Sequence, residues 1–188
     1  MILTTSTSAN IMKNTMKEPI DLLLKSGLRS GEIIERADFE SSNKDKSKYK
    51  RIVYLYLFDK QKRLLVQRRA KHVKFPLTLC VSTVGHVDAG EYSQKAVERE
   101  LQEELGLNAK NMNIKFLFSY IMYNCFCDVY ACIHDFTIDD IKFDPNEVDS
   151  VEFIPLDEFK TMMRDENNHF RKIYGTAPCD VLYLFIDK

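Results

Sequence analysis

Short apolar runs separated by polar turns dominate the first part of the chain. Residues 51–69 hold two runs of β-branched and aromatic residues joined across "DKQK", a pattern typical of a β-hairpin. Residues 20–36 place two more runs around the turn-rich "KSGLRSG" and predict another hairpin. The mostly polar segment 40–50 predicts a solvated loop, and "TLCVSTV" at 78–84 predicts one short strand.

A helical pattern is clearest over residues 93–105. Val97, Leu101 and Leu105 recur every four residues as one apolar stripe, and Gly106 is placed to end the helix. Later apolar runs predict strands near 113–122, 126–134 and 150–154, and helices in "LDEFKTMMRDE" and "PCDVLYLFIDK". Strands that alternate with a few helices indicate a mixed α/β fold.

Length and composition are consistent with one domain. A chain of 188 residues with 45% hydrophobic residues can bury one substantial core, so we expect a single domain over residues 19–188. Residues 1–18 are rich in Ser and Thr and lack an acidic residue before Glu18, which faintly resembles an organelle transit peptide, but they contain no arginine. We therefore expect a disordered extension and a cytoplasmic protein, with an organelle as the alternative.

Charge and cysteine usage exclude several function classes. The 27 basic and 28 acidic residues give no field for sequence-independent nucleic-acid binding. The longest apolar stretch, "FLFSYIMYNCFCDVYACI", is interrupted by polar residues and does not predict a membrane span. The five cysteines lack the spacings of a disulfide framework or zinc site. Cys125 and Cys127 are interpreted as buried strand thiols, with metal or redox chemistry as the alternative.

The chain is nearly neutral as a whole, but one segment is strongly acidic. Residues 85–107, "GHVDAGEYSQKAVERELQEELGL", hold six acidic and two basic side chains. At about 100° per helical residue, Glu100, Glu103 and Glu104 share one arc beside the apolar stripe. Like charges at such spacings repel by about 0.2–0.5 kcal/mol per pair, so something should compensate them. A solvated helix face would explain these three glutamates if they stood alone.

They belong to a longer pattern, G-x5-E-x7-R-E-U-x-E-E-x-G-U, in which U is a bulky aliphatic residue. Its fixed positions are all matched, by Gly85, Glu91, Arg99, Glu100, Leu101, Glu103, Glu104, Gly106 and Leu107. A chance match in such a chain is on the order of one in ten million. The segment resembles the signature of the Nudix hydrolase family, whose members cleave diphosphate bonds in nucleoside diphosphates linked to other groups. The resemblance implies an α/β/α sandwich around a mixed β-sheet.

The resemblance also implies a metal site. It assigns binding of Mg²⁺, with Mn²⁺ as a substitute, to Glu100, Glu103 and Glu104, with the carbonyl of Gly85 as a further ligand. Hard cations take such oxygen ligands, and the metal would neutralise the diphosphate and acidify the attacking water. The general base is left open.

The catalytic set implied by the resemblance is Glu103, Glu104 and Arg99, with Arg99 orienting the carboxylates through charge-assisted hydrogen bonds. Glu91 is expected to pair with Arg99 or to brace the loop. Gly85 and Gly106 are both expected to permit turns that a side chain would obstruct.

Substrate phosphates are expected to meet the basic segment 60–74, which holds seven basic and no acidic residues. The candidates are Arg69, Arg68 and Lys74, because guanidinium and ammonium groups bind phosphate oxygens. Strand alternation prevents both arginines from facing one site, and we favour Arg69. An exposed hairpin and loop is the alternative interpretation.

Two further carboxylates are weaker candidates. Asp128 lies in the apolar run "NCFCDVYACI" and needs a cation or a hydrogen-bond partner. It is expected to be an additional metal ligand or base, or else to lie at a bulge or edge. Glu147 occupies a position where family members often carry an acidic residue, although a loop carboxylate is its default interpretation.

A closer resemblance is to the Nudix branch related to type I isopentenyl diphosphate isomerase, carried by "LLVQRRAKHVKFP" and "STVGHVDAGE". His86 matches the metal-binding histidine of that enzyme. However, Val84 occupies the position of its catalytic cysteine, Cys80 lies too early to replace it, and the chain has no tryptophan. The intact glutamate pairs favour hydrolysis of a small-molecule diphosphate. Isomerase-like activity and a non-catalytic nucleotide-binding module are the alternatives, and a homodimer is left open.

Overall fold

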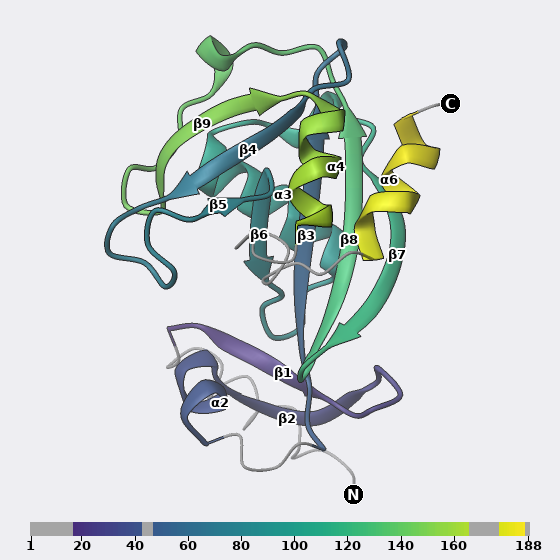
Figure 1. Ribbon diagram of the computed structural model, residues 1–188. Helices are drawn as coiled ribbons and strands as arrows, with labels where there is room; N and C mark the ends of the chain where they lie inside the picture. Colours follow the sequence, from purple (N-terminus) through teal and green to yellow (C-terminus); the bar gives the residue numbers. More distant parts are fainter. Residues whose placement is uncertain (1–16, 43–46, 166–176, 187–188) are drawn as a thin grey trace, which may run out of the picture.

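The computed structural model describes residues 17–42, 47–165 and 177–186 of the chain. Residues 1–16, which make up most of the expected N-terminal extension, lie outside this range. The described part contains a seven-stranded mixed sheet and a separate two-stranded sheet (Figure 1). The elements are β1 (Pro19–Leu23), β2 (Arg29–Glu35), α2 (Arg36–Ser42), β3 (Lys50–Phe58), β4 (Leu64–Arg69), β5 (Leu79–Cys80), β6 (Thr83–His86), α3 (Ser93–Leu105), η1 (Ala109–Asn111), β7 (Lys115–Met122), β8 (Cys125–Ile133), η2 (Ile138–Asp140), β9 (Val148–Ile154), α4 (Leu156–Arg164) and α6 (Ala177–Ile186).

Strand β3 lies at the centre of the large sheet. It pairs in parallel with β8 along its whole length, and β8 pairs antiparallel with β7. Seven consecutive residues of β3, 52–58, are buried, as expected for a strand that is covered on both faces. The expected hairpin between β1 and β2 is confirmed as an antiparallel pair.

The hairpin expected over residues 51–69 is present, but its strands separate directly after the turn. Phe58 and Leu64 are the partners recorded between β3 and β4, after which β3 pairs with β6 and β4 pairs with β5 and β9. The buried side chain of Ser82 lies in the gap. Its hydroxyl accepts from the backbone N–H of Leu57 at 2.8 Å and donates to the carbonyl of Leu65 at 2.6 Å.

Two expectations about local structure are therefore corrected. The single strand expected at 78–84 is two short strands, β5 and β6, because Ser82 turns inward between them and each joins a different partner. The solvated loop expected at 40–50 is wrong at both ends, because helix α2 continues to Ser42 and β3 begins at Lys50, while residues 43–46 of this expectation lie outside the described residues.

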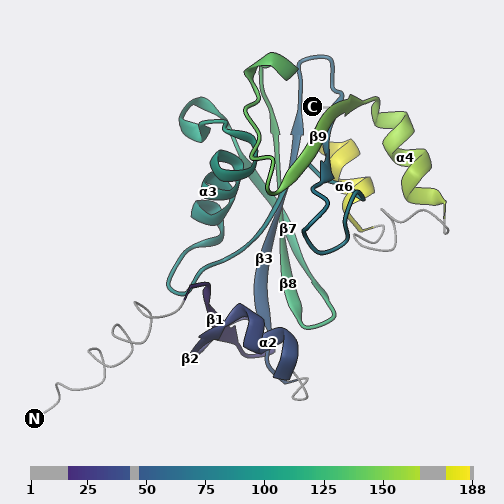
Figure 2. The same cartoon turned by 90° about the vertical axis from the view of Figure 1, so that its left-hand side faces the viewer.

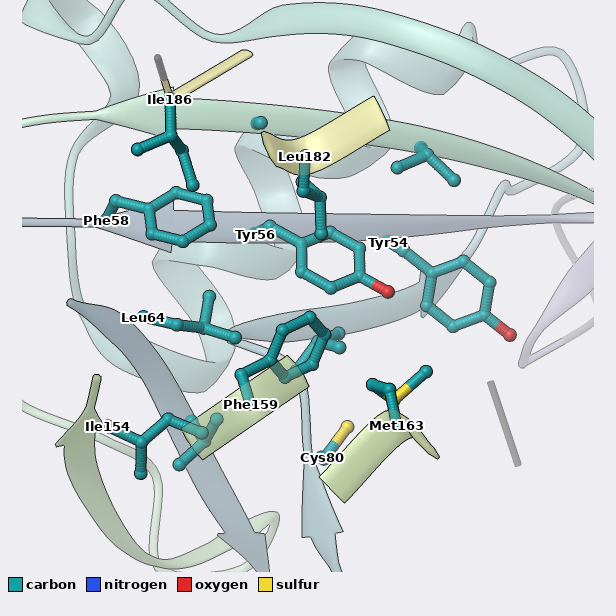
Figure 3. Close-up of a cluster of buried hydrophobic side chains, with 14 of the residues drawn as sticks. Tyr54, Tyr56, Phe58, Leu64, Cys80, Ile154, Phe159, Met163, Leu182 and Ile186 are labelled. Atoms are coloured by element: carbon teal, nitrogen blue, oxygen red, sulfur yellow. The ribbon is translucent and has the colours of Figure 1, made fainter. Parts of the chain in front are cut away.

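Helices cover both faces of the large sheet, as Figure 2 shows with the sheet between α3 and the pair α4 and α6. The apolar stripe of α3 packs on one face against β3 residues such as Val53 and Leu55. On the other face, Phe159 of α4 and Leu182 of α6 pack around Tyr56 (Figure 3). This is the expected α/β/α sandwich. Within the described ranges, no helix has both the length and the apolar character needed to cross a membrane.

Candidate active site

Helix α3 has the bounds that its sequence pattern predicts. It runs from Ser93 to Leu105, and Gly106 ends it in the left-handed conformation at φ 68°, donating its N–H to the carbonyl of Gln102 at 3.0 Å. Leu101 and Leu105 face the sheet and are fully buried. Because this stripe anchors one side of the helix, the neighbouring arc of glutamates runs from the buried edge of the helix to solvent.

The three glutamates differ sharply in exposure. Glu104 is buried at 6% relative exposure, Glu100 is partly buried, and the side chain of Glu103 is 58% exposed. Glu104 accepts a hydrogen bond from Nε2 of Gln67 at 2.8 Å and a longer one from the N–H of Val84 at 3.4 Å. Sequence reasoning did not identify Gln67, because its only signal is a polar residue between the apolar start of β4 and the two arginines that end it.

Arg99 connects the glutamates to the loop that precedes the helix. Its Nη1 donates to Glu100 at 2.8 Å and to Glu103 at 3.0 Å. The other side of the guanidinium donates to both carboxylate oxygens of Glu91, at 3.2 and 3.0 Å, and to the carbonyl of His86 at 2.8 Å. Burial lowers the pKa of Arg99, but the hydrogen bond with Glu91 and the charge of Glu100 outweigh it and raise that pKa above its ordinary value. The guanidinium therefore holds four groups in fixed relation.

Gly85 is needed for a reason other than the expected turn. It lies inside strand β6, opposite Val53, and its φ is not positive. A Cβ atom at this position would lie 1.9 Å from Cδ of Glu100. Glycine thus allows the carboxylate of Glu100 to pack directly against the backbone of β6.

Negative charge in this cluster is under-compensated. Burial, together with the charge of Glu100, raises the pKa of Glu104 to about 8. Burial also raises the pKa of Glu100 to about 7, despite the opposing effect of Arg99. Two neighbouring carboxylates with pKa values displaced in this direction favour protons or another cation.

The donor set suits a hard divalent cation. In the described ranges, no three His, Cys, Asp or Glu side chains surround a common point, because Glu100 and Glu103 turn to Arg99 and Glu104 turns to Gln67. Their oxygens, with the Gly85 carbonyl, are nevertheless the ligand type that Mg²⁺ takes. The unbalanced charge of Glu100 and Glu104 and the glycine that admits Glu100 both fit such an ion.

The basic candidates lie around the β4–β5 loop. Nε of Arg69 donates to the carbonyl of Lys74 at 2.8 Å, and Nη1 of Arg68 donates to the carbonyl of Leu77 at 3.0 Å. The loop needs these contacts because Phe75 and Leu77 both have positive φ, 57° and 58°. Regular alternation would place Arg69 on the same face of β4 as Gln67 and Arg68 on the other, although the pairing of β4 with β9 is irregular between Arg68 and Arg69.

The remaining candidates occupy different environments. Asp128 is a regular residue of β8, not a bulge, and its buried carboxylate accepts two hydrogen bonds from Nη1 of Arg51, at 2.8 and 2.7 Å. The hydroxyl of Ser119 also donates to it. His86 lies next to Gly85, with Nδ1 at 3.5 Å from Nη1 of Arg36. Glu147 is exposed, and its carbonyl accepts from Ala70 at 2.9 Å.

Four cysteines are free: Cys80, Cys125, Cys127 and Cys132. Cys127 is fully buried on β8, which confirms its interpretation as a strand thiol, while Cys125 is partly buried. Burial raises the pKa of Cys127 to about 12. Cys80 is also fully buried and packs in the core beside α4, with Met163 and Phe159.

Known proteins resemble this chain in sequence and in fold. The family model described as the NUDIX domain matches residues 48–174. Nudix hydrolase 3 of Arabidopsis thaliana is 26% identical over 165 residues, which cover 80% of this chain. An uncharacterized Nudix hydrolase of Listeria monocytogenes is 30% identical over 112 residues, or 59% of this chain. This chain spans 21% of the Arabidopsis protein and 66% of the Listeria protein.

A solved structure from Deinococcus radiodurans has the same fold. Its TM-score is 0.71 at 23% identity, and the match covers 89% of this chain and 98% of that chain. It therefore includes more of the sequence than the family model, which begins after the β1–β2 hairpin. The isomerase branch within the family stays a prediction.

Proposed function

Because this chain belongs to the NUDIX domain family, we propose that it hydrolyses a diphosphate bond in a nucleoside diphosphate-linked or related small molecule, with Mg²⁺ or Mn²⁺ as cofactor. The observation that carries the proposal is the pair of Glu104, which is buried, and Glu100, which is partly buried and packs against Gly85; both carboxylates have raised pKa values. An ordinary solvated helix face would leave both carboxylates in water. A bound divalent cation would balance the negative charge of these two carboxylates.

The side chains of α3 have distinct tasks in the proposed reaction. Glu100, Glu103 and Glu104 would hold the metal, which when bound neutralises diphosphate charge and lowers the pKa of a water molecule. Gln67 fixes the orientation of Glu104 through their 2.8 Å hydrogen bond. Arg99 fixes Glu100 and Glu103 in the same way. Glu103 is the most exposed carboxylate of the three, so we assign it acceptance of the proton from the attacking water.

Phosphate recognition is proposed for Arg69 and Lys74. Strand alternation favours Arg69 on the face of β4 that holds Gln67, and Gln67 contacts the glutamate cluster. Its hydrogen bond to the loop uses Nε, so its planar Nη groups suit a phosphate oxygen. Arg68 is the weaker candidate, because strand alternation directs it away from α3 and it lies 3.9 Å from Glu152 of β9. Asp128 is already paired with Arg51, so we give it no step in the reaction.

One domain is proposed for residues 19–188. The family model covers residues 48–174, but hydrogen bonds join the earlier hairpin to the motif loop. The carbonyl of Pro19, for example, accepts from the N–H of Ala89 at 2.8 Å. These contacts support a hairpin that belongs to the same folding unit as the sandwich.

The test is turnover across a panel of diphosphate compounds with Mg²⁺ and Mn²⁺, with products identified by mass spectrometry. Glu103→Gln and Glu104→Gln should each lower kcat/KM by about 100-fold or more, since each removes a charged metal ligand or proton acceptor. Glu98→Gln is the matched control, because Glu98 lies on the same helix but pairs with Lys95 at the surface. Wild-type turnover in both motif variants would refute the assignment.

The same panel separates the alternatives. Isopentenyl diphosphate is included, and its conversion to an isomer with the diphosphate intact would favour the isomerase-like reading. Val84 argues against it, because valine offers no proton donor at the position of the isomerase cysteine. Equilibrium binding of a nucleotide without any product would instead indicate a non-catalytic binding module.

A further inference from the structure

The β1–β2 hairpin lies outside the residues matched by the family model, yet it contacts the loop that carries the metal-binding motif. The hairpin covers residues 19–35, whereas the family model begins at residue 48. It lies at the end of the molecule away from β9 and α4, below the central sheet in Figure 1. The contacted loop, residues 87–92, joins β6 to α3.

The hairpin holds three consecutive residues of this loop. The N–H of Ala89 donates to the carbonyl of Pro19 at 2.8 Å. The N–H of Gly90 donates to Oδ2 of Asp21 at 2.8 Å, and Nη2 of Arg29 donates to the carbonyl of Glu91 at 2.6 Å. The two hairpin side chains also brace each other, because Nε of Arg29 lies 2.8 Å from Oδ2 of Asp21.

These contacts fix the backbone of the residue that holds Arg99. The carboxylate of Glu91 accepts from Arg99 at 3.2 and 3.0 Å and from the N–H of Asp88 at 3.1 Å. Arg99 in turn contacts Glu100 and Glu103 at 2.8 and 3.0 Å. An unbroken series of hydrogen bonds therefore runs from the hairpin to the carboxylates.

The two carboxylates involved are shielded from water, whereas the side chain of Arg29 is 44% exposed. The side chain of Asp21 is 14% exposed and that of Glu91 is 17% exposed, so water competes little for their oxygens. The loop also turns at Gly90, whose φ is 79°, and its N–H is the group that Asp21 binds. A loop with this bend has alternative conformations unless its amides are held.

We propose that Asp21 and Arg29 are positioning residues of the metal site. By holding the backbone at residues 89–91, they set the position of Glu91, and through Arg99 they orient the carboxylates for the cation. The hairpin is thus a working part of the site although it lies before the family match. This inference rests on the proposed metal-dependent function, because it assumes that the motif carboxylates bind the metal.

The experiment measures Mn²⁺ affinity directly, from the electron paramagnetic resonance signal of free Mn²⁺, alongside thermal unfolding of the metal-free protein. Asp21→Ala removes the acceptor for Gly90 and should raise the Kd for Mn²⁺ about tenfold. Asp21→Asn keeps a side-chain oxygen for the same N–H and should restore affinity to within about threefold of wild type. Glu32→Ala is the matched control, since Glu32 lies on the same hairpin but pairs with Lys48.

Kinetics provide a second readout. If the hairpin positions the ligands, saturating Mn²⁺ should return kcat of Asp21→Ala to within about threefold of wild type, while the metal concentration for half-maximal rate stays raised. Arg29→Met repeats the test from the other contact, through the carbonyl of Glu91, and is decisive if Asp21→Ala does not fold.

The outcomes separate the two hypotheses. A folded Asp21→Ala or Arg29→Met that binds Mn²⁺ like wild type overturns the positioning role and leaves the proposed function intact. A wild-type protein that fails to bind Mn²⁺ overturns both. An equal loss of affinity in Glu32→Ala would show that any damage to the hairpin has this effect, which also overturns the specific role of Asp21.

Discussion

Replacing Gly85 with alanine tests the central packing contact of the site. The added Cβ would lie 1.9 Å from Cδ, 2.0 Å from Oε1 and 2.2 Å from Cγ of Glu100. Each distance is far below the 3.4 Å at which ordinary contact begins, so the carboxyl group must retreat by roughly 1.5 Å. That retreat would break the 2.8 Å hydrogen bond between Glu100 and Arg99.

The size of the effect follows from the environment. Gly85 is buried inside β6, so the displaced side chain has little free volume to enter. Overpacking of this kind costs about 1–3 kcal/mol of folding free energy. In the absence of the clash, alanine would instead be favoured over glycine in a strand by about 0.5–1 kcal/mol. The expected sign of the substitution therefore depends on whether the Glu100 side chain is present.

A double-mutant cycle measures this dependence. Gly85→Ala is compared in the wild-type and Glu100→Ala backgrounds, with the free energy of unfolding taken from urea titrations of the metal-free protein. The substitution should destabilise the wild type by about 1–3 kcal/mol and be neutral or slightly stabilising when Glu100 is alanine. Equal effects in the two backgrounds, within about 0.5 kcal/mol, would refute the close approach of Glu100 to β6.

Three further predictions concern stability in the absence of metal. Gly106→Ala should lower the free energy of unfolding by more than about 2 kcal/mol, because the residue has φ 68° and its new Cβ would lie 2.7 Å from a backbone oxygen. Gly31→Ala, whose Cβ would have nothing within 4 Å, should lower it by about 1 kcal/mol. Urea unfolding of the two variants measures the difference. Arg51→Met should cost about 3–5 kcal/mol by leaving the buried Asp128 without its cation, and a cost below 1 kcal/mol by the same assay would contradict the ion pair. The raised pKa of Glu104, about 8, means that the folded state binds its proton more tightly than the unfolded state. Wild-type stability should therefore fall as pH rises from about 4.5 to 8, and Glu104→Gln should flatten this decline in thermal melts recorded with chelator.

The helix that carries the motif was predictable because its determinants are local. The apolar stripe, the spacing of the glutamates and the terminating Gly106 all lie within one short segment, and α3 has the predicted bounds. The resemblance also implied that Arg99 would orient the carboxylates, and in the structure Arg99 donates hydrogen bonds to Glu100 and Glu103. Helical spacing explains the contact with Glu103, four residues along α3, but not the contact with the adjacent Glu100.

Contacts between segments distant in sequence were harder to predict from the sequence. Alternation showed that Asp128 needs a partner, but Arg51 becomes that partner only because β3 and β8 pair in parallel. Gln67 contacts Glu104 because β3 and β4 separate where the side chain of Ser82 lies between them, which leaves Gln67 within reach of α3. No pattern within either strand specifies the neighbour that it will have.

The sequence by itself determined a mixed α/β fold and the helix that bears the candidate ligands, because periodicity and end signals act over a few residues. The family and the layer architecture followed from the resemblance of its motif to the Nudix signature. Only the tertiary structure showed why Gly85 must be glycine, and that Asp21 and Arg29 hold the loop before α3. Both findings depend on distances between backbone segments that strand pairing sets. Those distances are a property of the assembled sheet, and no single segment of the chain encodes them.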